Sequence, residues 1–214
     1  MKTLLRSTLI LTAACAASFA QQWEFGGAGG GGFLNTVNVN GVSGIGSATA
    51  GFQTGAAFGG YVGYSQSKHI GGEIRYGYLQ SNLKLSSGGS TATFKGMSHV
   101  VHYDLIFKTS RSAGKVQLFA AVGGGMKYFN GTGKEAAYQP LSQFGYFTKT
   151  SAVKPMASVG GGVKIAITRN VFIRTEVRDY ITSFPKDLIT PAPGTRYGNI
   201  LHDIVPMVGI GVQM

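Results

Sequence analysis

The chain reads VFIRTEVRDYI from Val171 to Ile181. Successive side chains of a β-strand point to opposite faces, so this stretch divides into two sets. The apolar set contains Ile173, Thr175, Val177 and Ile181, and the polar set contains Arg174, Glu176, Arg178 and Tyr180. A period of two over eleven residues predicts a strand with one apolar and one polar face.

The same alternation predicts eight strands, at about residues 22–34, 51–65, 70–84, 93–108, 115–130, 153–167, 171–184 and 200–214. Strands of soluble proteins average five or six residues, whereas most of these exceed ten. About ten residues is the length that a tilted strand needs to cross a bilayer. After Ala20 the sequence has no apolar run of about 18 residues, so we do not expect an α-helical span.

The predicted connections alternate in length. Short turns are expected at Ser65–Ile70, Thr109–Gly114 and Thr168–Asn170, and longer loops at Asn35–Ala50, Ser86–Ala92, Gly131–Ala152 and Phe184–Gly198. Short turns at one end and long loops at the other are typical of outer-membrane barrels, whose short turns are periplasmic. The pattern therefore predicts an all-β, eight-stranded, antiparallel, up-and-down transmembrane β-barrel with both termini in the periplasm.

Composition agrees with a packed β protein. Glycine makes up 34 of 214 residues, while charged residues are 13% and hydrophobic residues 43%. With 6 prolines and no three-residue glycine period the chain is not collagen-like, and its hydrophobic share is too high for a disordered chain.

Residues 1–20 have the parts of a secretory signal peptide. Lys2 and Arg6 precede an apolar stretch from Leu9 to Ala17, and a small residue, Ala20, ends the segment. We expect cleavage after Ala20, which leaves residues 21–214 as one outer-membrane β-barrel domain.

The only cysteine, Cys15, lies inside this segment, so the mature chain has no thiol for disulfides or metal ligation. A lipoprotein signal with Cys15 as the lipidated residue is the alternative.

Strand parity assigns side chains to the two faces of the barrel. The expected lipid face contains Phe58, Val62, Tyr64, Ile74, Tyr76, Tyr78, Val101, Tyr103, Leu105, Phe107, Val163, Ile165, Ile167, Val208, Ile210 and Val212. The expected lumen set contains Glu24, Glu73, Arg75, His102, Asp104, Lys127, Lys164, Arg174, Glu176, Arg178 and Asp203. Besides His102 this set holds five acids and five bases, a balance that suits a narrow lumen closed by ion pairs.

Removal of Lys2 and Arg6 lowers the formal net charge from +11 to +9. Export argues against nucleic acid as the partner of this basic chain. We expect instead an attraction to anionic outer-membrane lipid, including lipopolysaccharide phosphates; an ordinary solvated surface is the alternative.

Three glycine runs, at 26–32, 123–125 and 160–162, could be mistaken for phosphate-binding loops, but no helical pattern follows them. Glycines inside strands indicate bends and room for long inward side chains.

Four stretches carry a family resemblance: GEIRYGY at 72–78, FAAVGGGMKY at 119–128, GGGVK at 160–164 and RTEVRDY at 174–180. They resemble strands of the small eight-stranded outer-membrane β-barrel family that includes the OmpA transmembrane domain and OmpX. The resemblance covers about residues 22–214 and implies the barrel without specifying its task.

Members of this family resemble one another in their last strand, which the barrel-assembly machinery recognises. Gly209, Val212 and Met214 occupy the positions of this signal, with Met214 where the family usually has Phe. The resemblance implies a cell outer-membrane location, and we expect a monomer.

Catalytic and metal sites are not expected, and neither is a cofactor. Ser98, His102 and Asp104 share a strand face, but residues four apart on a strand lie about 13 Å apart, too far for a Ser-His contact. The four histidines, His69, His99, His102 and His202, are scattered along the chain. Three functions stay open: a structural or surface-interaction barrel that acts through its loops, a narrow porin-like channel for small solutes, and a lipid-modifying enzyme. We favour the first.

Overall fold

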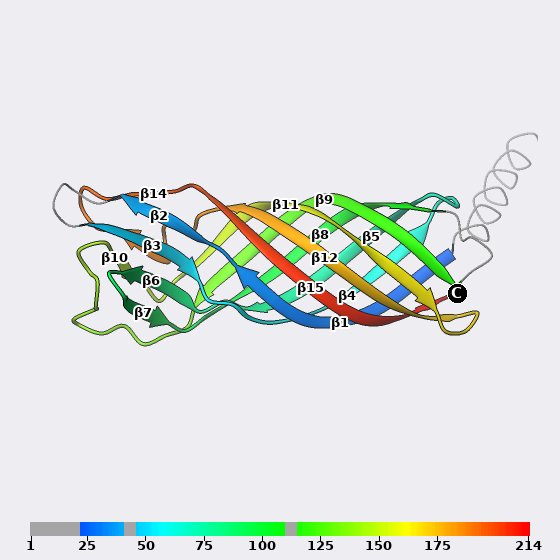
Figure 1. Ribbon diagram of the computed structural model, residues 1–214, viewed down its shortest axis with the longest axis horizontal. Coiled ribbons are helices and arrows are strands. Elements are labelled where there is room, and N and C mark those ends of the chain that lie inside the picture. The colour runs from blue at the N-terminus through cyan, green and yellow to red at the C-terminus, as the bar shows by residue number, and fades with distance from the viewer. Residues whose placement is uncertain (1–21, 41–45, 110–114) are drawn as a thin grey trace, which may run out of the picture.

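The computed structural model describes residues 22–40, 46–109 and 115–214, which form mainly β-strands (Figure 1). Within these ranges eight long strands form a closed barrel: β1 (Gln22–Leu34), β4 (Gly55–Ser65), β5 (Ile70–Gln80), β8 (Gly96–Lys108), β9 (Val116–Gly131), β11 (Ser151–Ala166), β12 (Val171–Ser183) and β15 (Ile200–Gln213). Their order around the ring is β1-β15-β12-β11-β9-β8-β5-β4. The predicted eight-stranded, antiparallel, up-and-down barrel is confirmed. The predicted signal peptide lies outside the described residues.

The first and last strands close the ring. β1 pairs antiparallel with β15 from Glu24 and Gln213 to Leu34 and Asp203, and it also pairs along its length with β4. Each barrel strand thus has a partner on both sides, so the backbone groups of the wall are paired around the ring. None of the described residues forms a helix that is long and apolar enough to cross a membrane.

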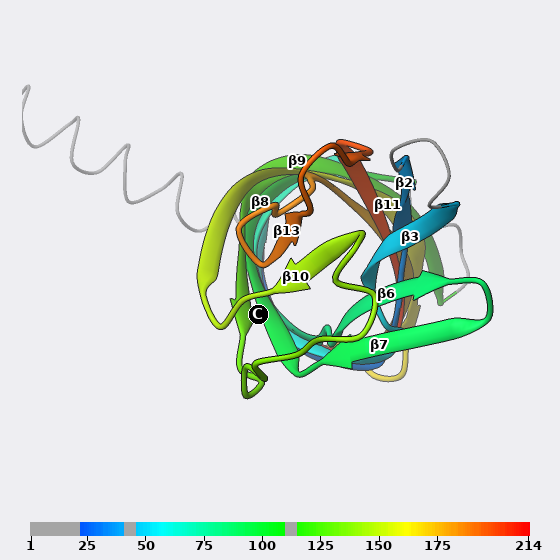
Figure 2. The ribbon, with the colours of Figure 1, turned by 90° about the vertical axis from the view of Figure 1, so that its left-hand side faces the viewer.

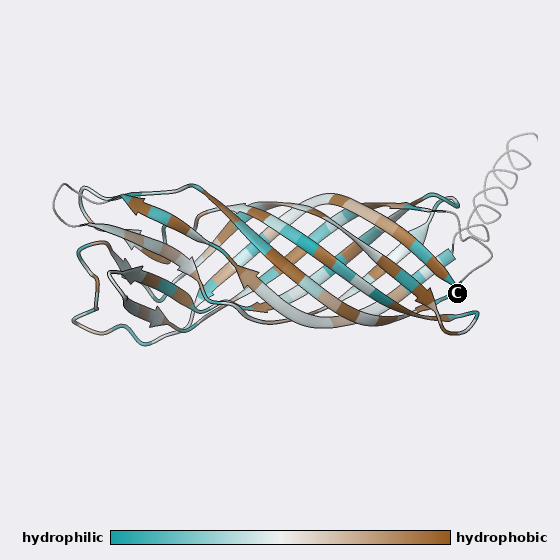
Figure 3. Cartoon of the chain, viewed as in Figure 1, coloured by the Kyte–Doolittle hydropathy of each residue, from teal (hydrophilic) through white to brown (hydrophobic). Residues whose placement is uncertain are grey.

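Hydrophobic and hydrophilic residues alternate along the barrel strands, as Figure 3 shows, and buried and exposed residues alternate with the same period of two. On β12 the exposed Ile173 and Val177 point outward, whereas the neighbouring Arg174, Glu176 and Arg178 are buried. Every residue of the expected lipid face is exposed except Tyr64, Tyr78 and Val163, which are half-buried. The outer wall of the barrel is therefore an apolar surface.

Two clusters of outward aromatic side chains lie towards the two ends of this surface. The cluster near the short turns contains Trp23, Tyr64 and Tyr103, and the cluster near the opposite end contains Tyr76, Tyr78, His99 and Tyr128. The hydroxyls of Tyr64 and Tyr103 are 2.8 Å apart, and the Tyr76 hydroxyl is 2.7 Å from Nδ1 of His99. Aromatic girdles of this kind mark the two interfaces of a membrane-spanning barrel.

The segments expected to be long loops contain further strands. Residues of these loops form a second set of strands beyond the barrel, here called the cap (Figure 1). A five-stranded sheet has the order β14 (Arg196–Tyr197), β2 (Thr36–Asn40), β3 (Ser47–Phe52), β6 (Leu83–Ser87) and β7 (Ser90–Phe94), and a two-stranded sheet pairs β10 (Gly145–Phe147) with β13 (Ile189–Pro191). The alternation Val37, Val39 and Leu83, Leu85 continues past the barrel and gives these strands a buried face.

Three predicted barrel strands are consequently too long at the cap end. The structure starts β4 at Gly55 and β8 at Gly96, and it ends β5 at Gln80. At the break the Asn82 carbonyl accepts a hydrogen bond from the Gln53 backbone N–H (2.8 Å), and the Asn82 side-chain oxygen accepts one from the Gly96 N–H (3.2 Å). The wall therefore ends at a hydrogen-bonded junction between barrel and cap.

The β6–β7 hairpin turns at Gly88 and Gly89. Both have positive φ, +54° and +83°, a conformation that side-chain-bearing residues rarely adopt. Positive φ at both central residues is what a two-residue type I′ hairpin requires. This glycine pair closes a cap hairpin in a segment that the sequence reading assigned to a loop.

Apolar side chains from both cap sheets pack over the mouth of the barrel. Phe52 stacks on Phe129 with ring centroids 5.2 Å apart, and Phe94 stacks on Phe147 at 5.7 Å. Figure 2 looks onto the cap along the barrel and shows β10 and β13 lying over the ring. Tyr197 on β14 links the five-stranded sheet to the residue that precedes β10, because its hydroxyl donates a hydrogen bond to the Phe144 carbonyl at 3.0 Å. Burial raises the pKa of Tyr197 to about 12. The cap is thus a packed structure whose apolar core continues into the upper end of the barrel.

Arginine at Val177 tests the outward face. Val177 is 49% exposed in the middle of β12, so Val177→Arg places a charge among acyl chains and should destabilise the folded barrel by about 2–4 kcal/mol. Gln143→Arg, at an exposed cap turn, is the control and should change the free energy of folding by less than about 0.5 kcal/mol. Urea titrations in lipid vesicles measure both values; equal tolerance of the two arginines would show that Val177 does not face lipid.

Candidate functional site

The barrel interior holds the charged side chains that parity placed there. All eleven members of the expected lumen set are buried: Glu24, Glu73, Arg75, His102, Asp104, Lys127, Lys164, Arg174, Glu176, Arg178 and Asp203. Each lies on a barrel strand, and the outward residues on either side of it are apolar or small, except for Asp179 beside Arg178 and His202 beside Asp203, which pair with each other at 2.8 Å. The interior is therefore polar and ionic, while the outer wall is apolar.

The central ion pairs join opposite sides of the ring. β5 and β12 are four strands apart in a ring of eight, so their inward side chains face each other across the lumen. A nitrogen of Arg75 on β5 lies 2.5 Å from a carboxylate oxygen of Glu176 on β12, and Arg174 on β12 reaches Glu73 on β5 at 2.6 Å. These two pairs cross the full width of the barrel.

Further contacts join these two pairs into one cluster. Glu73 also accepts from Arg178 at 3.2 Å, and Arg178 reaches Asp104 on β8 at 2.5 Å. Nδ1 of His102 lies 2.9 Å from Asp104. Each buried charge of the cluster has an opposite charge beside it, which is the condition under which charges can remain in a dry interior.

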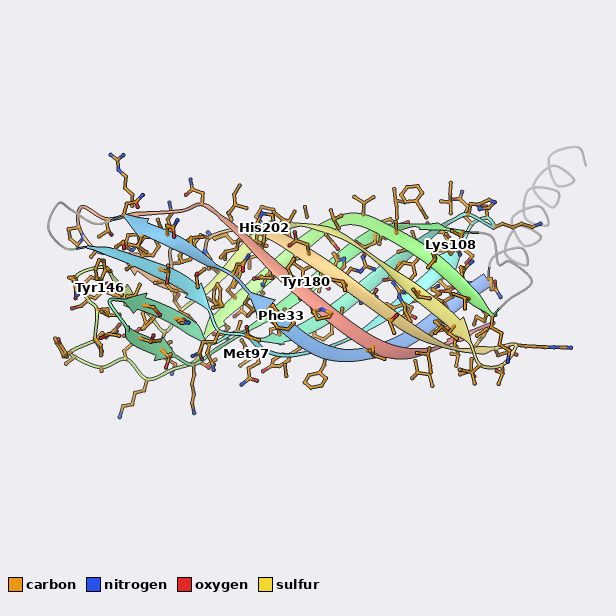
Figure 4. The ribbon with its side chains drawn as sticks, viewed as in Figure 1. Phe33, Met97, Lys108, Tyr146, Tyr180 and His202 are labelled. Carbon is orange, nitrogen blue, oxygen red and sulfur yellow. The ribbon has the colours of Figure 1, made fainter. Side chains whose placement is uncertain are left out.

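Single ion pairs lie above and below this cluster. Lys164 on β11 pairs with Glu24 on β1 towards the short turns, and Lys127 on β9 pairs with Asp203 on β15 towards the cap. The strands in each of these pairs are three apart in the ring, so these contacts also cross the lumen. Tyr180, labelled in Figure 4, lies inside the barrel with its ring edge against His102.

Sequence reasoning missed several residues of the site. Tyr61 and Phe119 flank the Arg174 guanidinium, with ring centroids 4.4 and 4.3 Å from its carbon, and so provide cation–π contacts. At the mouth Lys154, the cross-strand neighbour of Lys127, pairs with Asp187 of the cap at 3.3 Å. Inward parity would have found Tyr61, Phe119 and Lys154, whereas Asp187 follows no strand pattern.

Inward glycines make room for the cluster. A Cβ added at Gly123 would lie 2.3 Å from Oδ1 of Asp104, and one at Gly160 would lie 2.5 Å from Cδ of Arg178. Such distances are far below van der Waals contact. At these two positions glycine lets the large charged side chains of neighbouring strands lie flat against the wall.

The geometry does not assemble a catalytic site from the residues considered above. The Ser98 hydroxyl accepts a hydrogen bond from Ser81 at 3.2 Å, while the His102 imidazole pairs with Asp104, and Asp104 is also bound by Arg178. In the described part of the chain, His, Cys, Asp and Glu residues form no group of three or more that could hold a metal ion.

The last strand places the proposed assembly signal at the closure of the ring. Gly209 pairs with Ala28 on β1 and with Arg174 on β12, and Val212 points outward. The Met214 backbone N–H donates to the Trp23 carbonyl at 2.9 Å. Recognition of Gly209, Val212 and Met214 by assembly machinery stays a prediction.

Comparison with known proteins agrees with this architecture. Residues 7–199 match the family model described as outer membrane protein beta-barrel domain. The outer membrane protein OprG from Pseudomonas aeruginosa is similar in structure with a TM-score of 0.54 and 13% identity, over 89% of this chain and 95% of OprG. Neisserial surface protein A, NspA, has a TM-score of 0.51 and 13% identity, over 90% of this chain and 97% of its own. Identities this low show a shared fold alone. No curated protein matches the sequence.

Alanine at two adjacent glycines tests the crowding of the lumen. Gly123→Ala should destabilise the barrel by about 1–3 kcal/mol, because the new methyl group overlaps Asp104 and the Tyr103 carbonyl. In Gly124→Ala the added methyl group points outward and lies 3.4 Å from its nearest neighbouring atom, so this substitution should be neutral or slightly stabilising. Urea titrations of both variants in lipid vesicles measure the difference; a larger loss for Gly124→Ala would reverse the assigned faces of β9.

Proposed function

Because the chain belongs to the outer membrane protein β-barrel domain family, we propose that it is a closed barrel with a structural or surface-interaction role, performed by its cap. In this proposal the barrel anchors and orients the cap in the bacterial outer membrane. The lumen carries no solute.

The arrangement of the ends supports an orientation. β1 begins and β15 ends at the same end of the barrel, together with the short connections after β4 and β11. Barrels of the outer membrane have short periplasmic turns and longer extracellular segments. We place both termini in the periplasm and the cap outside the cell.

The observation that carries the proposal is the bridging of opposite strands by Arg75, Glu176, Arg174 and Glu73. A solute that passes through the barrel would have to separate these pairs, which are buried and have side chains that are about 2% exposed or less. Removal of one partner from a buried pair costs about 3–5 kcal/mol. The lumen should therefore remain closed at rest.

The cap has features of an interaction surface. Tyr138 is 77% exposed and Tyr146 43% exposed, both in the segment between β9 and β11. Exposed tyrosines held on a packed scaffold are common anchors of protein interfaces, because they contribute contact area at small entropic cost. Figure 4 shows Tyr146 on the cap, well away from the barrel wall.

Conductance across planar lipid bilayers tests the closed lumen. The wild-type protein should give no unitary current steps, whereas Glu176→Lys should give them, because it places a fourth cation beside Arg75, Arg174 and Arg178. Glu135→Lys makes the same charge change on the exposed cap and should stay silent. Regular steps from the wild-type protein would contradict the proposal and favour a narrow channel for small solutes.

A further inference from the structure

Four lysines gather where the cap meets one side of the barrel. These rim lysines are Lys84, Lys95, Lys134 and Lys149. Lys95 lies between β7 and β8, Lys134 follows β9, and Lys149 precedes β11. Since β8, β9 and β11 are consecutive in the ring, these three lysines stand above one continuous part of the wall.

Backbone contacts bring the rim lysines together. The Lys95 carbonyl accepts hydrogen bonds from the backbone N–H groups of Thr132 (2.8 Å) and Gly133 (3.0 Å), so Lys134 follows directly beside Lys95. The Lys149 backbone N–H donates to Oε1 of Glu135 at 2.5 Å, which places Lys149 next to the same segment.

Lys84 extends the group along the sheet. Lys84 on β6 pairs with Thr93 on β7, and the exposed Lys95 follows two residues after Thr93, just past the end of β7. Diagonal neighbours of this kind are about 7–8 Å apart. The four ammonium groups can therefore reach a common ligand.

The rim lysines carry charge that the protein itself does not neutralise. In the described part of the chain none of the four has an ion-pair partner, and a single carboxylate, Glu135, which accepts the hydrogen bond from the Lys149 backbone N–H, stands against these four positive charges. At the mouth of the barrel Lys154 is paired with Asp187 of the cap. Arg196 lies on β14, at the opposite edge of the five-stranded sheet from β7.

The wall below the rim is suited to lipid. Tyr128 and Val153 are outward cross-strand neighbours on β9 and β11, and Met126 and Val101 continue the exposed apolar surface. Met97, labelled in Figure 4 at the junction of wall and cap, lies on β8. Cationic groups just above an aromatic girdle lie at the depth of lipid head groups.

We propose that the rim lysines bind the phosphates of a phosphorylated glycolipid of the outer leaflet, with its acyl chains along the outer face of β8, β9 and β11. The inference rests on the proposed function for the orientation of the cap. Phosphate recognition by several lysines explains why this edge is basic while the lumen is balanced. An acyl chain on the wall distinguishes a lipid ligand from a free anion.

Binding of bisphosphorylated lipid A to the refolded full chain in neutral detergent tests the proposal. A lysine near an anionic membrane surface contributes about fivefold in affinity, so the quadruple variant K84Q/K95Q/K134Q/K149Q should bind at least about 100-fold more weakly. The matched control, K68Q/K115Q/R169Q/R196Q, removes four charges from the short turns and the far cap edge and should retain the wild-type affinity within about threefold.

Two further arms separate the sources of phosphate. Dephosphorylated lipid A should bind the wild type as weakly as bisphosphorylated lipid A binds the quadruple variant, and inorganic phosphate at the same concentration should not displace lipid A. Equal losses in the quadruple variant and the matched control, or displacement by phosphate alone, would overturn the proposal. Heat-modifiable gel migration checks that each variant is folded. Current steps from the wild-type protein would refute the closed lumen without changing these affinities, so the two failures are distinguishable.

Discussion

The pairing of Arg75 and Arg174 with carboxylates on the opposite side of the ring is the interaction on which the rest of the structure depends. Charges removed from water are costly unless opposite charges lie in direct contact. In a ring of eight strands the interior is just wide enough for side chains to fill, so long side chains from opposite strands meet at its centre. This requirement accounts for the equal numbers of acids and bases in the lumen and for glycine at Gly123 and Gly160, where the wall must leave room for them.

On the same strands the outward side chains are mainly apolar, whereas the inward side chains are charged. From Ile173 to Arg178 each step along β12 changes between the outer surface and the ion-paired interior, so a slip of one residue would expose Arg174 to lipid and bury Val177 among charges. Register is therefore strongly determined within the barrel. Beyond the Asn82 junction the strands are short and no longer face lipid. One face of each cap sheet packs inward and the other face is exposed to solvent. The rim lysines stand at this boundary, where lipid ends and water begins.

The barrel strands and the side of the wall on which each residue lies could be predicted from the sequence, because an alternation with a period of two can be recognised within a single strand. The stretch from Val171 to Ile181 was sufficient to assign its faces, and the same parity placed the lumen charges. The ion-pair partner of each lumen charge could not be predicted from the sequence alone. Arg75 and Glu176, for example, are 101 residues apart and meet only because of the order of the strands in the ring. The cap was missed for a different reason. Its Ser-, Thr- and Gly-rich segments have the composition of loops, although Gly88 and Gly89 between two alternating runs are a hairpin signal. Lys154 was missed although parity pointed it inward beside Lys127.

A double-mutant cycle between Arg75 and Glu176 tests the central claim most directly. The free energy of folding in lipid vesicles would be measured for the wild type, Arg75→Met, Glu176→Gln and the double variant. Contact across the lumen predicts that the two losses are not additive, with a coupling energy of about 1–3 kcal/mol. Additivity within about 0.5 kcal/mol would mean that the two side chains do not meet, and the account of a lumen held closed from opposite strands would be contradicted.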